Sequence, residues 1–249
     1  MPPPPADQTL DLFPERAERR LEPHAPLAER MRPRSLDDLV GHEALLAPGR
    51  PLRTLMAEGA LPSLLLWGPP GSGKTTLAWI LGEMQNARLV PLSAVTAGVP
   101  EIRKAIEAAG RTRLRTLLFI DEIHRLNKAQ QDALLPHVEA GTVTLVGATT
   151  ENPSFSVIAP LLSRCRVITL EALDDEAIGR VLDRALSDEA LGLGASRVVL
   201  ADEAREALIR AAQGDARRAL GMLEASATVH LSSGRRAEPL SAATVEEAV

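Results

Sequence analysis

The chain has 249 residues, enough for one large domain or two small ones, and its 45% hydrophobic and 24% charged residues are typical of a soluble globular protein. The formal net charge of −5 excludes a protein that is basic throughout, so any contact with nucleic acid must come from a local basic patch. The single Cys excludes an internal disulfide, and no apolar run is long enough to span a membrane, so we expect a cytoplasmic protein without membrane contact.

Residues 1–25 are rich in proline and charge and show no sustained hydrophobic period, which predicts a disordered tail. The tail nevertheless contains the string QTLDLF at 8–13, which uses one of only three Phe in the chain. Apolar side chains in a segment that cannot form a core indicate either a docking peptide or a staple that folds back onto the protein's own surface.

Residues 26–170 alternate short apolar runs with helical patterns. The runs SLLLW, TLLFI and VTLVGAT, at 63–67, 116–120 and 143–149, have the length and flanking turn residues of buried parallel strands. Helical patterns such as KTTLAWILGEMQ and KAQQDALLPHVEA lie between them. Strands that alternate with helices predict an α/β fold, with a parallel sheet flanked by helices.

The strand signal stops at about residue 170. The string DDEAIGRVLDRAL places its apolar residues on one helical face, and the amphipathic segments ADEAREALIRAA and DARRALGMLEASA follow it. We therefore expect a small all-helical domain over 171–232. Residues 233–249 are expected to form a linker and the start of a truncated C-terminal helix, with Ser241 at its N-cap.

The string GPPGSGKT at 68–75 matches the phosphate-binding pattern GxxxxGK[ST], between an apolar strand and a helical pattern. Glycines allow backbone N–H groups to wrap phosphates, Lys74 reaches the β- and γ-phosphates, and the Thr75 hydroxyl holds Mg²⁺. Without its strand and helix, the pattern could be a chance glycine-rich turn. We expect ATP and Mg²⁺ here, with nucleotide contacts from Gly68, Pro69, Pro70, Gly71, Ser72, Gly73, Lys74, Thr75 and Thr76.

Two further apolar strands end in polar residues. The string LLFIDEIH ends in two carboxylates, of which Asp121 is expected to hold Mg²⁺ and Glu122 to deprotonate the attacking water. Alone, this pair could be a solvated acidic strand end, but the phosphate-binding pattern upstream favours the catalytic interpretation. The strand LVGATT ends in hydroxyl residues that could position the water or sense the γ-phosphate.

Two arginines carry a weaker signal. Arg164, in LLSRC, follows an apolar pair at a helix end, and Arg217, in GDARRAL, could reach back to the phosphates from the helical domain. For each, the alternative is an ordinary solvated arginine on a helix surface.

The order of these elements resembles that of the AAA+ ATPases, and is most similar to the clamp-loader clade. Longer strings, among them LLLWGPPGSGKTTLA, DEIHRLNKAQQDALLPHVEAGTVTLVGATTENPSF and GDARRALGMLE, are similar to the replication-associated recombination protein A family. That family includes the eukaryotic Werner-helicase-interacting ATPases. The resemblance covers nearly everything from residue 27 onward.

The resemblance implies a DNA-stimulated ATPase that acts at stalled or gapped replication forks, as an oligomer with each ATP site at a subunit interface. By this pattern Thr150 is the first sensor, Arg217 the second, and Arg164 a finger that enters the neighbouring subunit's site. The adenine would lie near Val40 and Gly41. Family members continue past the end of this chain with a domain that drives tetramer formation, so the chain looks truncated relative to them.

The resemblance also implies partners. In clamp-loader relatives the segment similar to VTAGVPEIRKAI faces nucleic acid, which makes Arg103 and Lys104 candidates for contact with single-stranded or forked DNA. Arg125 and Lys128 are further candidates, and a solvated basic helix is the alternative. The tail peptide resembles those that dock bacterial proteins onto the DNA polymerase sliding clamp. Its candidate contacts are Gln8, Leu10, Leu12 and Phe13.

Three other functions fit parts of the pattern. A clamp-loader-like subunit would share every motif, and a non-hydrolysing adaptor would use the nucleotide site only to support a binding surface. The string DEIH also occurs in two-domain helicases, but the helical C-terminal part cannot supply a second motor domain. The five His show no metal-ligand spacing, so no metal other than Mg²⁺ is expected.

Overall fold

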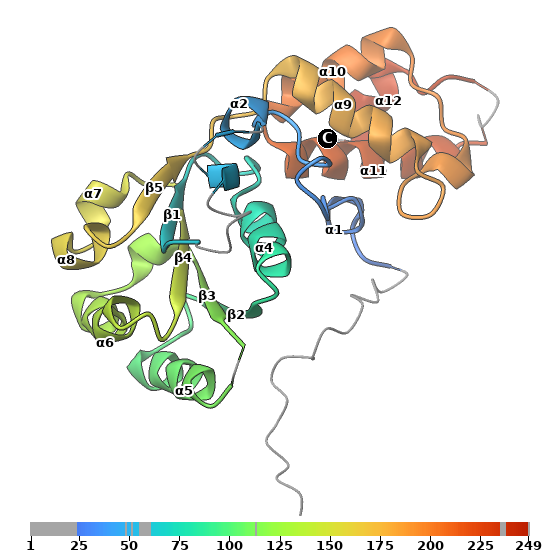
Figure 1. Cartoon of the computed structure of the whole chain (residues 1–249). Coiled ribbons are helices and arrows are strands. Elements are labelled where there is room, and N and C mark those ends of the chain that lie inside the picture. Colours follow the sequence, from blue (N-terminus) through green and yellow to red (C-terminus); the bar gives the residue numbers. More distant parts are fainter. Residues whose placement is uncertain are drawn as a thin grey trace, which may run out of the picture.

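The computed structural model describes residues 24–47, 49–50, 52–54, 61–112, 114–234 and 238–248. Figure 1 shows an α/β unit and a helical unit beside each other. The α/β unit contains one parallel sheet of five strands in the order β2-β3-β4-β1-β5. The strands are β1 (Leu64–Trp67), β2 (Arg88–Ser93), β3 (Thr116–Asp121), β4 (Thr144–Thr149) and β5 (Arg166–Thr169).

The three expected strands are the three central ones. The side chains of β1 and β3 are almost entirely buried, which explains their continuous apolar runs. The two edge strands were not expected, because β2 is only partly buried and β5 is mostly exposed, so neither has such a run. Because all strands are parallel, the carboxyl ends of β1, β3 and β4 lie at the same edge of the sheet.

Helices cover both faces of the sheet (Figure 1). On one face, α4 (Lys74–Met84) packs Leu77 and Leu81 against Leu64 and Leu66 of β1. On the other, α5 (Val99–Gly110) and α6 (Lys128–Glu139) pack with the alternate strand residues. This division follows from the period of two along a strand. The short elements are α2 (Glu43–Leu46), a 3₁₀ turn η1 (Ile123–Arg125), α7 (Pro153–Ser156) and α8 (Ala159–Leu162).

The helical unit consists of α9 (Asp175–Ser187), α10 (Asp202–Ala212), α11 (Ala216–Ser232) and α12 (Ala242–Ala248), with a 3₁₀ turn at Gly194–Ser196. Acidic N-caps begin two of these helices, since Asp174 accepts a hydrogen bond from Ala177 N–H and Asp215 accepts one from Arg218 N–H. Among the described residues no helix is long and apolar enough to cross a bilayer.

The packing of the helical unit extends beyond the expected boundaries at both ends of the chain. Leu27 of α1 (Leu27–Arg30) is fully buried in its core, and the Leu27 N–H donates to the Glu224 carboxylate at 2.9 Å. Leu240 and Val245 are buried in the same core, so α12 packs as part of this unit. The helices α1 and α12, which precede and follow the α/β unit in sequence, therefore pack in the same core. Each of them has an apolar face that needs an apolar partner.

Ion pairs join the helical unit to the segment that precedes α4. Arg184 of α9 lies 3.5 Å from the Asp38 carboxylate, and Arg180 lies 2.8 Å from that of Glu43. Both pairs are partly exposed, so each contributes at most about 1 kcal/mol. Both arginines lie on α9 apart from its buried apolar residues Ala177, Ile178, Leu182 and Ala185, which pack in the core of the helical unit.

Candidate nucleotide site

A cleft opens between the carboxyl edge of the sheet and the helical unit. Its floor is the phosphate loop, the turn that joins β1 to α4. Its lining residues include Asp38, Leu39, Val40, residues 70–76, Asp121, Glu122, Thr150, Leu173, Val181, Arg184, Ala216 and Arg217. The cleft therefore combines the ends of β3 and β4 with the first turns of α4 and α11.

Backbone conformation shapes the phosphate loop. Gly71 and Gly73 have φ values of +68° and +91°, a left-handed region in which a side chain would be strained. Gly73 is the N-cap of α4, so the first turn of that helix points its free N–H groups into the cleft. The glycine spacing of the sequence pattern is thus a requirement of the turn itself.

Lys74 is almost fully buried at the floor of the cleft. Its ammonium donates to the carbonyl oxygens of Gly68 and Pro69, at 2.8 and 2.7 Å. Burial lowers the pKa of Lys74, and the neighbouring Glu122 and Asp121 carboxylates oppose that shift. Lys74, Asp121 and Glu122 also line the same cleft, so their charges lie together at its floor.

The two carboxylates follow one another at the end of β3. Asp121 is the last residue of the strand, and Glu122 adopts φ 54° and ψ 45°, a left-handed conformation that is costly for a residue other than glycine. The surrounding structure holds this strained backbone, and the two side chains line the same cleft. Such strain is concentrated at functional sites.

The donors and acceptors of the cleft match a nucleotide and a divalent cation. The Ser72 hydroxyl is buried in the phosphate loop and has no hydrogen-bond partner among the described residues, which fits a phosphate oxygen as its missing partner. The Thr75 hydroxyl and the Asp121 carboxylate line the same cleft, and both are oxygen ligands of the kind that Mg²⁺ prefers.

Comparison with known proteins agrees with this geometry. Residues 64–172 match the model of the ATPase family associated with various cellular activities (AAA). The chain is 53% identical over 202 residues to replication-associated recombination protein A of Escherichia coli K12, and 49% identical to that of Haemophilus influenzae. Each alignment covers 80% of this chain and 45% of the relative, so the chain spans about half the length of these relatives. The chain belongs to the replication-associated recombination protein A family of AAA ATPases.

Solved structures give the same fold. The Thermotoga maritima RuvB Holliday junction branch migration motor superposes with a TM-score of 0.71 and 30% sequence identity. The alignment covers 88% of this chain and 72% of that one, so it includes the helical unit as well as the sheet. The expected AAA+ α/β fold with a helical lid is confirmed.

Most predicted nucleotide contacts of this family member line the cleft. Pro70 to Thr76 form its floor, Val40 lies on its apolar wall, and Thr150 and Arg217 lie on its rim. Gly68, Pro69 and Gly41 are not among its lining residues. The Gly68 and Pro69 carbonyls accept hydrogen bonds from Lys74, and Gly41 packs towards Leu173. The roles of all these residues stay predictions.

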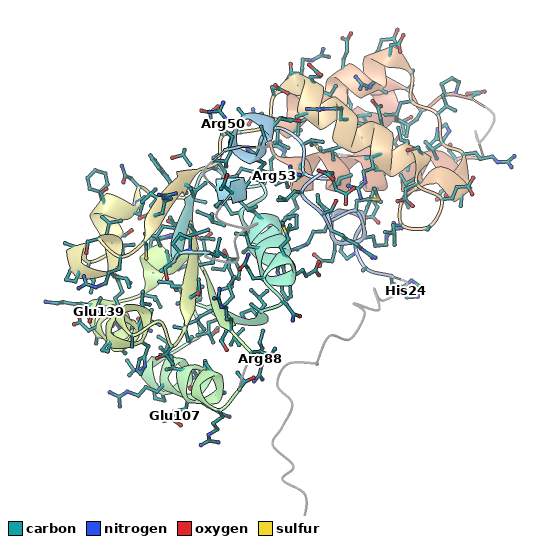
Figure 2. The ribbon with its side chains drawn as sticks, in the orientation of Figure 1. His24, Arg50, Arg53, Arg88, Glu107 and Glu139 are labelled. Carbon is teal, nitrogen blue, oxygen red and sulfur yellow. The ribbon has the colours of Figure 1, made fainter. Side chains whose placement is uncertain are left out.

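Arg164 lies outside the cleft of its own chain. Its guanidinium pairs with the Glu139 carboxylate at 2.5 Å and donates to Pro160 O at 2.7 Å. Figure 2 labels Glu139 at the outer side of the α/β unit, away from the helical unit. Arg164 is therefore not part of the cleft of its own chain, and its role as a finger stays a prediction.

The partner candidates are on the surface or beyond the described residues. Arg103 and Lys104 of α5, Arg125 of η1 and Lys128 of α6 are all exposed. The tail peptide with Gln8, Leu10, Leu12 and Phe13 lies outside the described residues, and its contact with a sliding clamp stays a prediction.

Three residues at the site had no role in the sequence analysis. His42 is buried, and its Nε2 lies 2.7 Å from the Ser72 carbonyl of the phosphate loop. His124 contacts Glu122, and Asp215 packs against Gly71. The strings DEIH and GDAR contain the last two, but only the fold shows what they touch.

We expect Gly71→Ala to destabilise the protein by about 1–3 kcal/mol and to weaken nucleotide binding. A Cβ at Gly71 would lie 1.9 Å from Asp215 Oδ1, so either the phosphate loop or the start of α11 would have to move. Thermal unfolding and titration with ATP measure the two effects.

Gly221→Ala is the matched control. Gly221 is exposed within α11 with nothing near its absent Cβ, so alanine should stabilise the helix by about 0.5–1 kcal/mol. An unchanged melting temperature and ATP affinity in Gly71→Ala would contradict the tight contact with Asp215.

Proposed function

We propose that this chain is the catalytic part of a Mg²⁺-dependent ATP hydrolase that acts with DNA in replication-associated recombination and repair, at stalled or gapped forks. The meeting of Lys74, Asp121 and Glu122 at one cleft, with Thr150 and Arg217 on its rim, carries this proposal. The E. coli and H. influenzae relatives support the biological setting, since they are named for replication-associated recombination.

The shape of the cleft supports ATP as the ligand. Val40, Leu173 and Val181 make one end apolar, which suits the faces of a purine base. The phosphate loop at the other end offers backbone N–H groups and Lys74, which suit a triphosphate. We infer that the adenine lies beside Val40 and the phosphates along 71–75.

The reaction follows from the side chains at the floor. Lys74 can exchange its bonds to the Gly68 and Pro69 carbonyls for phosphate oxygens without moving far. Asp121 and Thr75 would hold Mg²⁺, which neutralises phosphate charge when bound. Glu122 then accepts the proton of the attacking water, and Arg217 adds positive charge from the helical unit.

The position of Arg164 supports an oligomer. Because this arginine lies outside its own cleft, we infer that it completes the site of the next subunit. In this proposal each ATP site lies between two copies of the chain. The working form is then a cytoplasmic homo-oligomer that can load onto the fork.

The exposed basic residues of α5 support contact with DNA, and Arg103→Ala with Lys104→Ala tests it. We expect DNA-independent ATP turnover to be unchanged, because neither residue lines the cleft. Half-maximal stimulation of ATP turnover by single-stranded or gapped DNA should require a higher DNA concentration. The slope of log DNA affinity against log salt concentration is negative, and its magnitude should decrease by about 1.4. Each phosphate contact to a single strand contributes about 0.7 to that magnitude.

Arg205→Ala with Arg210→Ala removes the same charge from α10 and is the control for this double variant. Equal loss of stimulation in both double variants would mean that general charge, and not α5, attracts the DNA. ATP binding without turnover in the parent chain, with or without DNA, would favour a non-hydrolysing adaptor.

A further inference from the structure

We propose that His124 is a positioning residue that holds the Glu122 carboxylate and joins it by hydrogen bonds to the phosphate loop. The proposal rests on the proposed hydrolysis of ATP and assigns a role within that reaction. His124 belongs to η1, the turn that directly follows Glu122.

The imidazole of His124 bridges two strand ends. Its Nε2 lies 3.2 Å from Glu122 Oε2, and its Nδ1 lies 3.0 Å from the Thr149 hydroxyl at the end of β4. The Glu151 carboxylate lies near the same nitrogen, at 3.7 Å from Nε2, and is farther from it than Glu122. The His124 side chain is only 13% exposed, so water competes weakly for these contacts.

In the hydrogen bond between His124 and Glu122, the imidazole Nε2 is the donor. Glu122 must be ionised to accept a proton from water, so it can only accept a hydrogen bond, and Nε2 must carry the proton. Nδ1 can then accept from the Thr149 hydroxyl, in which case the single proton of that hydroxyl is not donated to the Glu151 carbonyl oxygen 3.1 Å away. The neutral ring with its proton on Nδ1 is excluded, because it would turn a lone pair towards the carboxylate.

Thr149 extends the connection to the phosphate loop. Its side chain is buried, its hydroxyl is within 3.1 Å of the Glu151 backbone, and its carbonyl accepts a hydrogen bond from Gly68 N–H at 3.2 Å. Gly68 begins the loop that holds the phosphates. A continuous path therefore runs from this loop through Thr149 and His124 to the Glu122 carboxylate.

The contact with His124 restricts the conformation of the Glu122 side chain. The Glu122 backbone is in a strained left-handed conformation, and its side chain is about one-third exposed, so the carboxylate would sample several rotamers without a partner. A base misplaced by 1 Å can lose on the order of 10²-fold in rate. We infer that His124 selects the rotamer in which Glu122 faces the cleft.

The test separates the two ends of the imidazole. Asn at 124 can mimic Nδ1 and keep the bond to Thr149, whereas Gln can mimic Nε2 and keep the donor to Glu122. We expect His124→Ala and His124→Asn to lower kcat by on the order of 10²-fold, with KM and ATP affinity within about twofold of the parent. His124→Gln should recover most of the rate.

His137→Ala, which removes an imidazole from the distant end of α6, is the control and should keep the parental rate. Full kcat in His124→Ala, or equal loss in His124→Gln and His124→Asn, would overturn the proposal. If the parent chain and Glu122→Gln both fail to hydrolyse ATP, the proposed function itself is at fault.

A second measurement is independent of turnover. Nitrogen-15 NMR of the full chain, with His124 assigned by comparison with His124→Gln, should show a ring protonated at Nε2. Glu122→Gln should shift that nitrogen, because the amide is a weaker acceptor than the carboxylate. A neutral ring protonated at Nδ1, or no shift in Glu122→Gln, would contradict the geometry.

Discussion

Glu122→Gln is expected to lower ATP turnover by about 10²- to 10⁴-fold while ATP binding survives. The amide has nearly the shape of the carboxylate, but it cannot accept the proton of the attacking water. Lys74 and the phosphate loop are untouched, and the removed negative charge would otherwise repel the phosphates, so affinity should stay equal or rise. Steady-state turnover and equilibrium titration with ATP measure the two quantities.

Glu203→Gln is the matched control for this change. Glu203 is exposed at the start of α10, so the same substitution there should leave turnover at the parental level. If Glu122→Gln hydrolyses ATP as fast as the parent, another group must activate the water. Parallel loss of ATP binding would indicate that the variant has perturbed the cleft as a whole.

Arg164→Ala is expected to lower turnover by about 10³-fold or more, again with ATP binding intact. Arg164 does not line its own cleft, so in the proposed oligomer its effect comes through a neighbouring subunit. Its ion pair with Glu139 is exposed and contributes at most about 1 kcal/mol, so the variant should fold and the guanidinium can leave this partner readily.

Mixing two inactive variants tests whether Arg164 acts in the ATP site of a neighbouring subunit. Arg164→Ala keeps Glu122, and Glu122→Gln keeps Arg164, so an equimolar mixture creates some interfaces with both residues intact. We expect the mixture to hydrolyse ATP faster than either variant alone. Arg210→Ala on α10 should behave as the parent, and an oligomeric mixture without recovery would contradict a finger acting between subunits.

Local features of the sequence were sufficient for the class of fold and for much of the cleft. The phosphate loop is defined by glycine spacing, since Gly71 and Gly73 occupy conformations that other residues avoid. The central strands are buried on both faces and therefore appear as continuous apolar runs. Because parallel strands end at one edge, the sequence also predicted that Lys74, Asp121 and Glu122 would meet.

Only the tertiary structure decided the contacts between segments that are far apart in sequence. The edge strands β2 and β5 lack an apolar signature, and Leu27 and Val245 enter the core of the helical unit from opposite ends of the chain. The contact of Asp215 with Gly71 and the bridge from Thr149 to His124 depend on side-chain directions across separate elements. A local pattern determines which groups are present and on which element they lie, whereas packing of the apolar faces determines which of them touch.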